Sequence, residues 1–163
     1  MSHWGRHLLL LGTWSPDASR IAAFVQTVDR IVLFDPRKAW HDQTPDVLPA
    51  LEGGCWPLEW SPDGRQLTCR GSSATFAYSF KSRSYQRLTE YPTSVAWLGD
   101  NRRLITESRD GRLLLMDSLS KHTSEVLSTL PQHSFSPHLS RDNRQVFFMR
   151  GDDQADIYML SIK

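Results

Sequence analysis

The stretch WSPDGRQL, residues 60–67, decides the fold, because the chain spells it a second time as WSPDASRI at residues 14–21. Looser copies follow as WLGDNRRL at residues 97–104 and LSRDNRQV at residues 139–146. The copies begin at residues 14, 60, 97 and 139, so they are 46, 37 and 42 residues apart. Such spacing is typical of a repeated unit of four short strands.

The turn chemistry of the phrase explains why it recurs. Pro62 presets φ for the first corner of a type I turn, Asp63 can bond its own backbone, and Gly64 tolerates a left-handed conformation. The other copies hold Ala18, Asn101 and Asn143 at the glycine position. Asn is the next best residue at positive φ, so the first copy, with Ala18, is the least ideal. The phrase predicts a tight hairpin turn.

Apolar stretches flank every copy of the turn, as CWPLEW before and RQLTCRG after the second copy. A third stretch follows at residues 29–35, 74–80, 110–117 and 155–162, and a more polar fourth one follows as DVLPAL, SYQRLTE and SEVLSTL. Each unit therefore predicts a four-stranded antiparallel meander. The second and third strands are almost continuously apolar, which indicates burial of both faces. Meanders covered by copies of themselves are the blades of a β-propeller.

The composition limits the classes of partner. The 163 residues are 39% hydrophobic, which is enough for one domain with a sizeable core. Lys and Arg number 19 against 18 Asp and Glu, a net charge of +1 that would not attract nucleic acid or an anionic membrane. The longest apolar run, residues 8–11, is far shorter than the ~20 residues of a membrane helix. We expect neither a nucleic-acid partner nor a membrane partner.

The cysteines and the N-terminus bear on location. Cys55 and Cys69 are too few for a disulfide framework and lack metal-ligand spacing, so we expect a reducing compartment. No export signal is visible. The chain is predicted to be cytoplasmic, or periplasmic if it is cut from a larger exported protein.

The motifs WSPDGRQLT, WSPDASRIA and LSRDNRQVFFM, followed by DIYMLSIK, resemble the Pro-Asp repeats of the TolB-type β-propeller family, relatives of the WD-repeat propellers. The resemblance covers essentially the whole chain. Leu98-Gly99 replaces Ser-Pro in the third copy, and Arg141 replaces Pro in the fourth. The resemblance implies a rigid ring that presents loops and a central opening to a protein or peptide. An unrelated all-β sandwich is the alternative fold.

We predict an all-β domain over residues 1–163, a β-propeller built from four four-stranded antiparallel blades at about 9–48, 49–91, 92–130 and 131–163. The last repeat ends after its third strand, so another segment must supply its outer strand. Residues 1–8 are predicted to do so, either within one chain or between two chains that complete an eight-bladed ring. A piece cut from a larger propeller is the third alternative.

Few residues suggest catalysis. The chain has no GxSxG stretch and no phosphate-cradling glycine pattern. No histidine recurs at equivalent positions in all four repeats, as an axial metal ring would require, and Glu59 and His138 are the polar exceptions on the expected inner strands. We predict no catalytic residue, no metal and no cofactor. Because some propellers of this type are lyases with an axial histidine cluster, the resemblance keeps a metal-dependent lyase or a lactonase-like hydrolase as the alternative.

Tryptophans supply the first candidates for partner contact. Trp14, Trp60 and Trp97 recur at one repeat position and are predicted to pack between blades. Trp40 and Trp56 lie outside that register, and exposed tryptophans dominate binding hot spots. Trp40 and its neighbour His41 also lie in the long loop AWHDQTPD, and long loops on rigid scaffolds often carry function.

Arginines of the third repeat supply the second candidates. Arg102 and Arg109 belong to its most basic stretch, which could bind a phosphorylated peptide or a nucleic acid. Asp100, Glu107 and Asp110 interleave with these arginines and favour an internally compensated surface. The predicted partner-binding residues are Trp40, His41, Trp56, Arg102 and Arg109.

These features together predict a noncatalytic binding or scaffold module for a protein or peptide. Two alternatives stay open: the propeller enzyme, and a fragment or engineered partial propeller with no function of its own.

Overall fold

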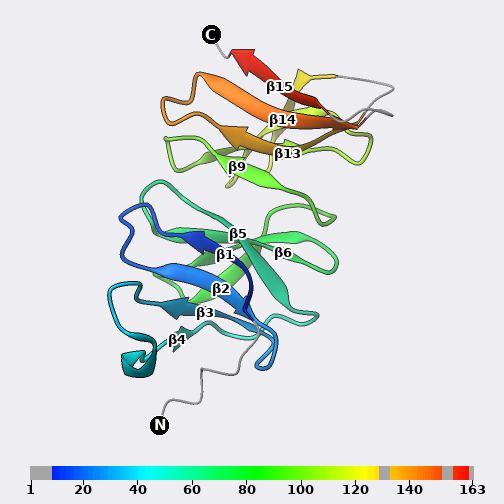
Figure 1. Ribbon diagram of the computed structural model, residues 1–163. Helices are drawn as coiled ribbons and strands as arrows, with labels where there is room; N and C mark the ends of the chain where they lie inside the picture. Colours follow the sequence, from blue (N-terminus) through cyan, green and yellow to red (C-terminus); the bar gives the residue numbers. More distant parts are fainter. Residues whose placement is uncertain (1–8, 129–132, 152–155, 162–163) are drawn as a thin grey trace. The chain divides into compact units, whose positions relative to one another are not determined.

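The computed structural model describes residues 9–128, 133–151 and 156–161. Within these ranges the chain forms fifteen strands in four antiparallel sheets and one short 3-10 helix (Figure 1). The sheets fall into two compact units, Met1–Pro92 and Thr93–Lys163, which are described separately.

The first unit contains two blades in which each strand pairs with the next in the sequence. Blade 1 consists of β1 (Leu9–Trp14), β2 (Ile21–Val25), β3 (Arg30–Phe34) and β4 (Asp46–Val47), with the helix η2 (Trp40–Asp42) between β3 and β4. Blade 2 consists of β5 (Cys55–Trp60), β6 (Gln66–Gly71), β7 (Thr75–Ser79) and β8 (Ser84–Arg87).

The second unit contains the other two sheets. Blade 3 consists of β9 (Val95–Trp97), β10 (Arg103–Glu107), β11 (Leu113–Asp117) and β12 (Thr123–Leu127). Blade 4 consists of β13 (His133–Leu139), β14 (Gln145–Gly151) and β15 (Asp156–Ser161), with β14 in the middle.

The predicted meander of each repeat is confirmed, and so is the all-β class. Three sheets have the four strands expected, and the fourth has three strands among the described residues. The outer strand expected from residues 1–8 lies outside the described residues. The single-domain boundary and the eight-bladed ring stay predictions.

Apolar side chains join the blades within each unit. In the first unit, Ile31 and Leu33 of blade 1 share one buried cluster with Leu67 and Tyr78 of blade 2. Neighbouring residues of blade 1, such as Val32, belong to a different cluster because successive side chains of a strand point to opposite faces. Blade 1 therefore buries both faces, as its continuous apolar strands predicted.

In the second unit, a buried apolar cluster and the hydrogen bonds of one glutamate connect blades 3 and 4. Ile105 and Leu113 share a buried cluster with Val146 and Phe148. The carboxylate of Glu107 accepts hydrogen bonds from the Thr93 hydroxyl at 3.2 Å and from the Ser136 backbone N–H. Glu107, which we expected to be a surface charge among the arginines, thus ties β10 to β13.

The repeated turn is closed by a serine and an aspartate. In the second copy the Ser61 hydroxyl donates to Asp63 at 2.7 Å and accepts the backbone N–H of Gln66 at 2.9 Å. Asp63 in turn accepts the N–H of Arg65 at 3.0 Å. The same three bonds recur in the first and fourth copies, around Ser15 with Asp17 and around Ser140 with Asp142. We call this arrangement the Ser-Asp clip.

The third copy has no serine, and its aspartate replaces the missing hydroxyl. Leu98 stands at the serine position, and Asp100 accepts the N–H groups of Arg102 at 3.0 Å and Arg103 at 2.8 Å. Arg103 is the residue whose counterparts bond to serine in the other copies. One carboxylate oxygen therefore satisfies the same backbone donors that the clip satisfies elsewhere.

The left-handed position of the turn is confirmed in all four copies. Gly64, Asn101 and Asn143 have φ of 68°, 59° and 57°. Ala18 has φ of 55°, a region that costs a residue with a Cβ about 1–2 kcal/mol. The first copy is thus the strained one, as its sequence predicted.

The two cysteines pair with each other, which their number and spacing did not indicate. Cys55 and Cys69 form a disulfide between β5 and β6, with Cα atoms 5.5 Å apart. Cys69 faces Pro57 across the ladder, so the cysteines are diagonal neighbours on one face of the hairpin. A crosslink across 14 residues stabilises a fold by about 3 kcal/mol in the chain-entropy model.

The prediction for the repeated tryptophans holds for two of the three. Trp60 and Trp97 are buried, and Trp60 stacks on Phe80 while its Nε1 donates to the carbonyl of Thr13 on β1 at 3.3 Å. Trp60 therefore packs toward the blade that precedes its own. Trp14 is 57% exposed, because no blade precedes blade 1 within the first unit.

Hydrogen bonds and cations hold several carboxyl groups in the ionised form. The Ser15 hydroxyl lowers the pKa of Asp17 to about 2, and Arg37 lowers the pKa of Asp35 to about 2. Asp110, beside Arg112, and Asp117, which accepts the Ser120 backbone N–H, also have pKa values of about 2.

Replacing Ala18 with Gly should stabilise the fold. Glycine adopts φ of 55° without the steric cost of a Cβ, so Ala18→Gly is expected to raise the free energy of unfolding by about 1 kcal/mol, measured by urea denaturation. Ala39→Gly is the matched control, because Ala39 is exposed and has φ of −60°. An equal gain, or no gain, in both variants would contradict the assignment of strain to the turn.

Acid should destabilise the fold in a defined pH window. Each lowered pKa lies below the ordinary value of 3.8, so the stabilisation is complete above about pH 4 and is lost as the pH falls through about 2. Urea denaturation from pH 5 to pH 2 should show this loss, and Asp17→Asn should reduce it. Glu52→Gln is the control, since the side chain of Glu52 is exposed and has no hydrogen bond or ion pair in the described part of the chain. An unchanged pH dependence in Asp17→Asn would refute the role of this carboxylate.

Candidate functional site

Trp40 and His41 lie in η2, at the end of blade 1 where β3 connects to β4. Trp40 stacks on Phe34 with ring centroids 5.3 Å apart and is 39% exposed. The imidazole of His41 lies 3.4 Å from the Asp42 carboxylate and is exposed to solvent. Trp40 therefore covers the end of the blade 1 core, and only part of its ring is open to a partner.

Arg102 and Arg109 belong to blade 3 in the second unit. Arg102 pairs with Asp117 at 2.6 Å, as Arg103 does with Asp100. Arg109 lies exposed in the turn between β10 and β11 and also has an interaction partner. The interleaved charges thus compensate one another, which we expected for this stretch.

Trp56 lines a cavity of about 320 Å³ in the first unit, which we call the Trp56 pocket. Its walls come from the β2–β3 turn, the β4–β5 connection and the ends of β5 and β6. The Trp56 ring is 47% exposed and meets Phe24 edge to face, with centroids 6.1 Å apart. The ring is thus held on a strand by an aromatic neighbour while much of its surface stays open.

Two charged side chains flank the ring. Arg70 lies directly opposite Trp56 in the β5–β6 ladder, so both side chains project from the same face. Asp29 lines the same pocket from the β2–β3 turn. Neither side chain has a hydrogen bond or an ion pair within residues 9–128, 133–151 and 156–161. The pocket therefore offers one cation, one anion and an aromatic surface to a ligand.

The loops of the pocket contain residues with positive φ angles. Asp29, Gly53 and Gly54 have φ of 53°, 79° and 73°. A Cβ on Gly53 would lie 2.5 Å from the Ser72 hydroxyl, and a Cβ on Gly54 would lie 3.2 Å from Asp29. Glycine is favoured at residues 53 and 54 because residues other than glycine rarely adopt these positive φ angles.

The sequence pointed to Trp56 but not to its companions. Gly53 and Gly54 fit no phosphate-cradling pattern in the sequence, and Arg70 was given no role. The position of Arg70 could have been predicted from the hairpin register, because pairing of residues 55–60 with 66–71 places Arg70 opposite Trp56. Asp29 lies in a different blade, so only the packing of blade 1 on blade 2 brings it into the pocket.

Among the described residues, no three His, Cys, Asp or Glu side chains gather in a way that could hold a metal ion. Glu59 contacts Thr68 through its backbone, and His138 is exposed. In the same described ranges, no helix has the length and apolar character needed to span a membrane.

The chain shares its fold with solved β-propellers. TolB from Acinetobacter baumannii superposes with a TM-score of 0.78 at 19% identity, over 96% of this chain and 42% of that one. A putative TolB from Agrobacterium tumefaciens gives 0.78 at 16% identity, over 95% and 58%. The β-propeller domain of Cps50 (Swd1) from Myceliophteria thermophila gives 0.64 at 12% identity, over 96% and 57%.

No protein-family model and no curated protein matches the sequence. The chain spans about half the length of the solved structures that it matches, from 42% to 58%. The four meanders and these superpositions together show that the chain has the fold of the TolB and WD-repeat β-propellers.

Proposed function

We propose that the chain is a noncatalytic binding module that holds a protein or peptide partner at the Trp56 pocket. The observation that carries the proposal is a half-exposed tryptophan on a strand, in a pocket that it shares with an arginine and an aspartate whose side chains have no partners in the described structure. A rigid aromatic ring gives a large contact area at little cost in conformational entropy.

The charges on either side of the ring suit a polypeptide. Arg70 can form a bidentate bond with a carboxylate, and Asp29 can accept from an ammonium, a guanidinium or a backbone N–H. An apolar side chain of the partner would cover Trp56 between these two polar contacts. The resemblance to TolB-type propellers, which implies a ring that presents loops to a partner, supports the same function.

The enzyme alternative has less support. The Trp56 pocket brings together one carboxylate, one arginine and one serine, and no hydrogen bond between Ser72 and Asp29 marks an activated nucleophile. Binding without chemistry therefore accounts for the pocket with the fewest assumptions.

Selection from a peptide library tests the proposal. Peptides are selected on the immobilised chain, and their affinities are measured by calorimetry for the chain and its variants. Trp56→Ala should weaken binding by more than about tenfold, because truncation of a hot-spot tryptophan removes most of the contact. Trp40→Ala is the matched control at the other end of blade 1 and should change the affinity by less than about twofold.

Two outcomes would overturn the proposal. Selected peptides that bind Trp56→Ala as tightly as the parent chain would place the binding site elsewhere. A library that yields no specific peptide would remove the support for a binding module of this kind.

We also propose that two chains associate through the exposed face of β1. Leu11 and Trp14 are 66% and 57% exposed, although both are large apolar residues on the first strand of blade 1. Exposed apolar surface of this kind favours association. The eight-bladed ring expected from the sequence is one form that such a dimer would take.

Light scattering after size exclusion measures the association. A dimer has about twice the 18.7 kDa mass of the chain, and Leu11→Ser with Trp14→Ser should shift it toward the monomer. Leu119→Ser is the matched control, because Leu119 is 68% exposed at the turn that follows β11 in the other unit. A mass of 18.7 kDa at every concentration would rule out the dimer.

Location remains a proposal with two alternatives. The sequence favoured the cytoplasm, in part because the two cysteines were not expected to pair. The Cys55–Cys69 disulfide argues for the periplasmic alternative, because disulfides persist in oxidising compartments.

A further inference from the structure

A second cavity, of about 260 Å³, lies at the opposite end of blade 1 from the Trp56 pocket. It is lined by the β1–β2 turn, which carries Ser19 and Arg20, and by the β3–β4 connection, which carries Lys38 and Thr44. These two segments lie at the same end of an antiparallel sheet, whereas the Trp56 pocket uses the β2–β3 turn. We call this cavity the Arg20 pocket.

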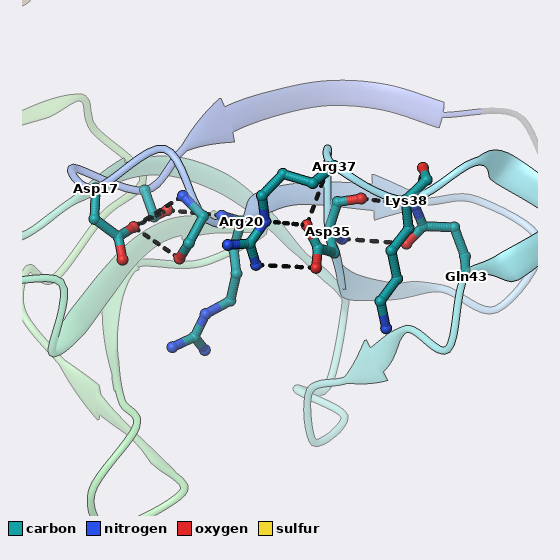
Figure 2. A network of polar contacts seen from close by, with 8 residues as sticks. Asp17, Arg20, Asp35, Arg37, Lys38 and Gln43 are labelled. Carbon is teal, nitrogen blue, oxygen red and sulfur yellow. Dashed lines mark hydrogen bonds and ion pairs between the residues drawn. The ribbon is translucent and has the colours of Figure 1, made fainter.

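Both carboxylates of the Arg20 pocket already have cationic partners. The Arg37 guanidinium donates to the two oxygens of Asp35 at 2.8 and 3.0 Å (Figure 2). Asp46 lies 3.8 Å from Arg83, which is outside the lining of the pocket. The closest cations to the two carboxylates are therefore Arg37 and Arg83, and Lys38 acts on Asp35 only as a more distant charge.

The loop that carries Lys38 is held in place by Gln43, whose side chain is buried. Its amide donates to the carbonyl oxygens of Asp35 at 2.7 Å and Lys38 at 3.0 Å, and its oxygen accepts the Asp35 backbone N–H at 3.1 Å. Arg20 is oriented by Phe80, whose ring centroid lies 5.5 Å from the guanidinium carbon. Both cations thus come from backbone that is ordered without a ligand.

Arg20 and Lys38 form no ion pair with a carboxylate within the described residues, although the charge of Lys38 helps to lower the pKa of Asp35. In Figure 2 their charged ends extend to the same side of the Asp35–Arg37 pair, and no dashed line reaches either of them. Ser19 and Thr44 line the same cavity, and the Ser19 hydroxyl already donates to Asp17 at 2.8 Å. Two cationic residues and the Thr44 hydroxyl group therefore line a space large enough for a small anion, beside carboxylates that have their own cationic partners.

We propose that the Arg20 pocket binds a phosphate group, either as free phosphate or as the phosphorylated side chain of a partner peptide. A dianion gains from both cations at once, with a planar fork on Arg20 and a point charge on Lys38. This site does not depend on the Trp56 pocket, and each can be lost without the other.

Amide chemical shifts measured by NMR test the site. The ¹⁵N-labelled chain is titrated with inorganic phosphate, against sodium chloride at matched ionic strength. The largest saturable shifts are expected at the amides of Ser19, Arg20, Lys38 and Thr44. In Arg20→Gln with Lys38→Gln the affinity should fall by roughly tenfold or more, since each charge-assisted contact contributes substantially to binding.

A second double variant controls for the loss of two positive charges. Arg65→Gln with Lys81→Gln removes the same charge from exposed positions outside the pocket and should change the affinity by less than about twofold. If the double variant of the pocket fails to fold, as judged by its NMR spectrum, Lys38→Gln alone replaces it, because Lys38 is an exposed loop residue.

A peptide arm distinguishes the two sources of phosphate. One phosphoserine peptide is compared with its unphosphorylated copy and with inorganic phosphate. Tighter binding of the phosphopeptide assigns the site to a modified partner, and equal binding assigns it to small anions. Shifts spread evenly over surface amides, or full affinity in the double variant, would overturn the proposal.

Discussion

The structure depends on one short interaction at the turn between the first two strands of each blade, the capture of backbone N–H groups by an aspartate, joined by a serine hydroxyl in three of the four copies. The hydroxyl of Ser61 accepts the N–H of Gln66 while it donates to Asp63. Because the turn fixes the register of its hairpin, it decides which apolar side chains face the neighbouring blade. The third copy shows that the backbone donors matter more than the serine, since Asp100 alone satisfies them.

The backbone N–H groups of this turn find their hydrogen-bond acceptors within the turn itself. The other loops of the blade therefore do not have to supply acceptors for them. In blade 1, the β1–β2 turn and the β3–β4 connection form the Arg20 pocket at one end, and the β2–β3 turn contributes to the Trp56 pocket at the other. Arg20 and Lys38 line the first pocket, while Trp56 shares the second with Arg70 and Asp29. The sheet of blade 1 thus contributes to two pockets of different chemistry.

The repeats made most of the fold predictable, because turn chemistry and apolar strands are local properties. The strands, the positive φ at Gly64 and its counterparts, and the burial of Trp60 all followed from the phrase and its surroundings. Trp14 was predicted to be buried and is exposed, because burial at that position requires a preceding blade. The disulfide and the position of Arg70 depend on which residues face each other across the β5–β6 ladder, and Asp29 lines the Trp56 pocket only through blade packing.

Native-state hydrogen exchange of the turn amides tests the central role of the clip most directly. The amides of Arg20, Gln66, Arg103 and Gln145 bond to the serine or aspartate of the turn in the four copies. They should exchange as slowly as the amides of the strands that they register, because opening the clip would release the hairpin. Exchange as fast as in the loops of the Trp56 pocket would show that the clip is incidental and that apolar packing alone sets the register.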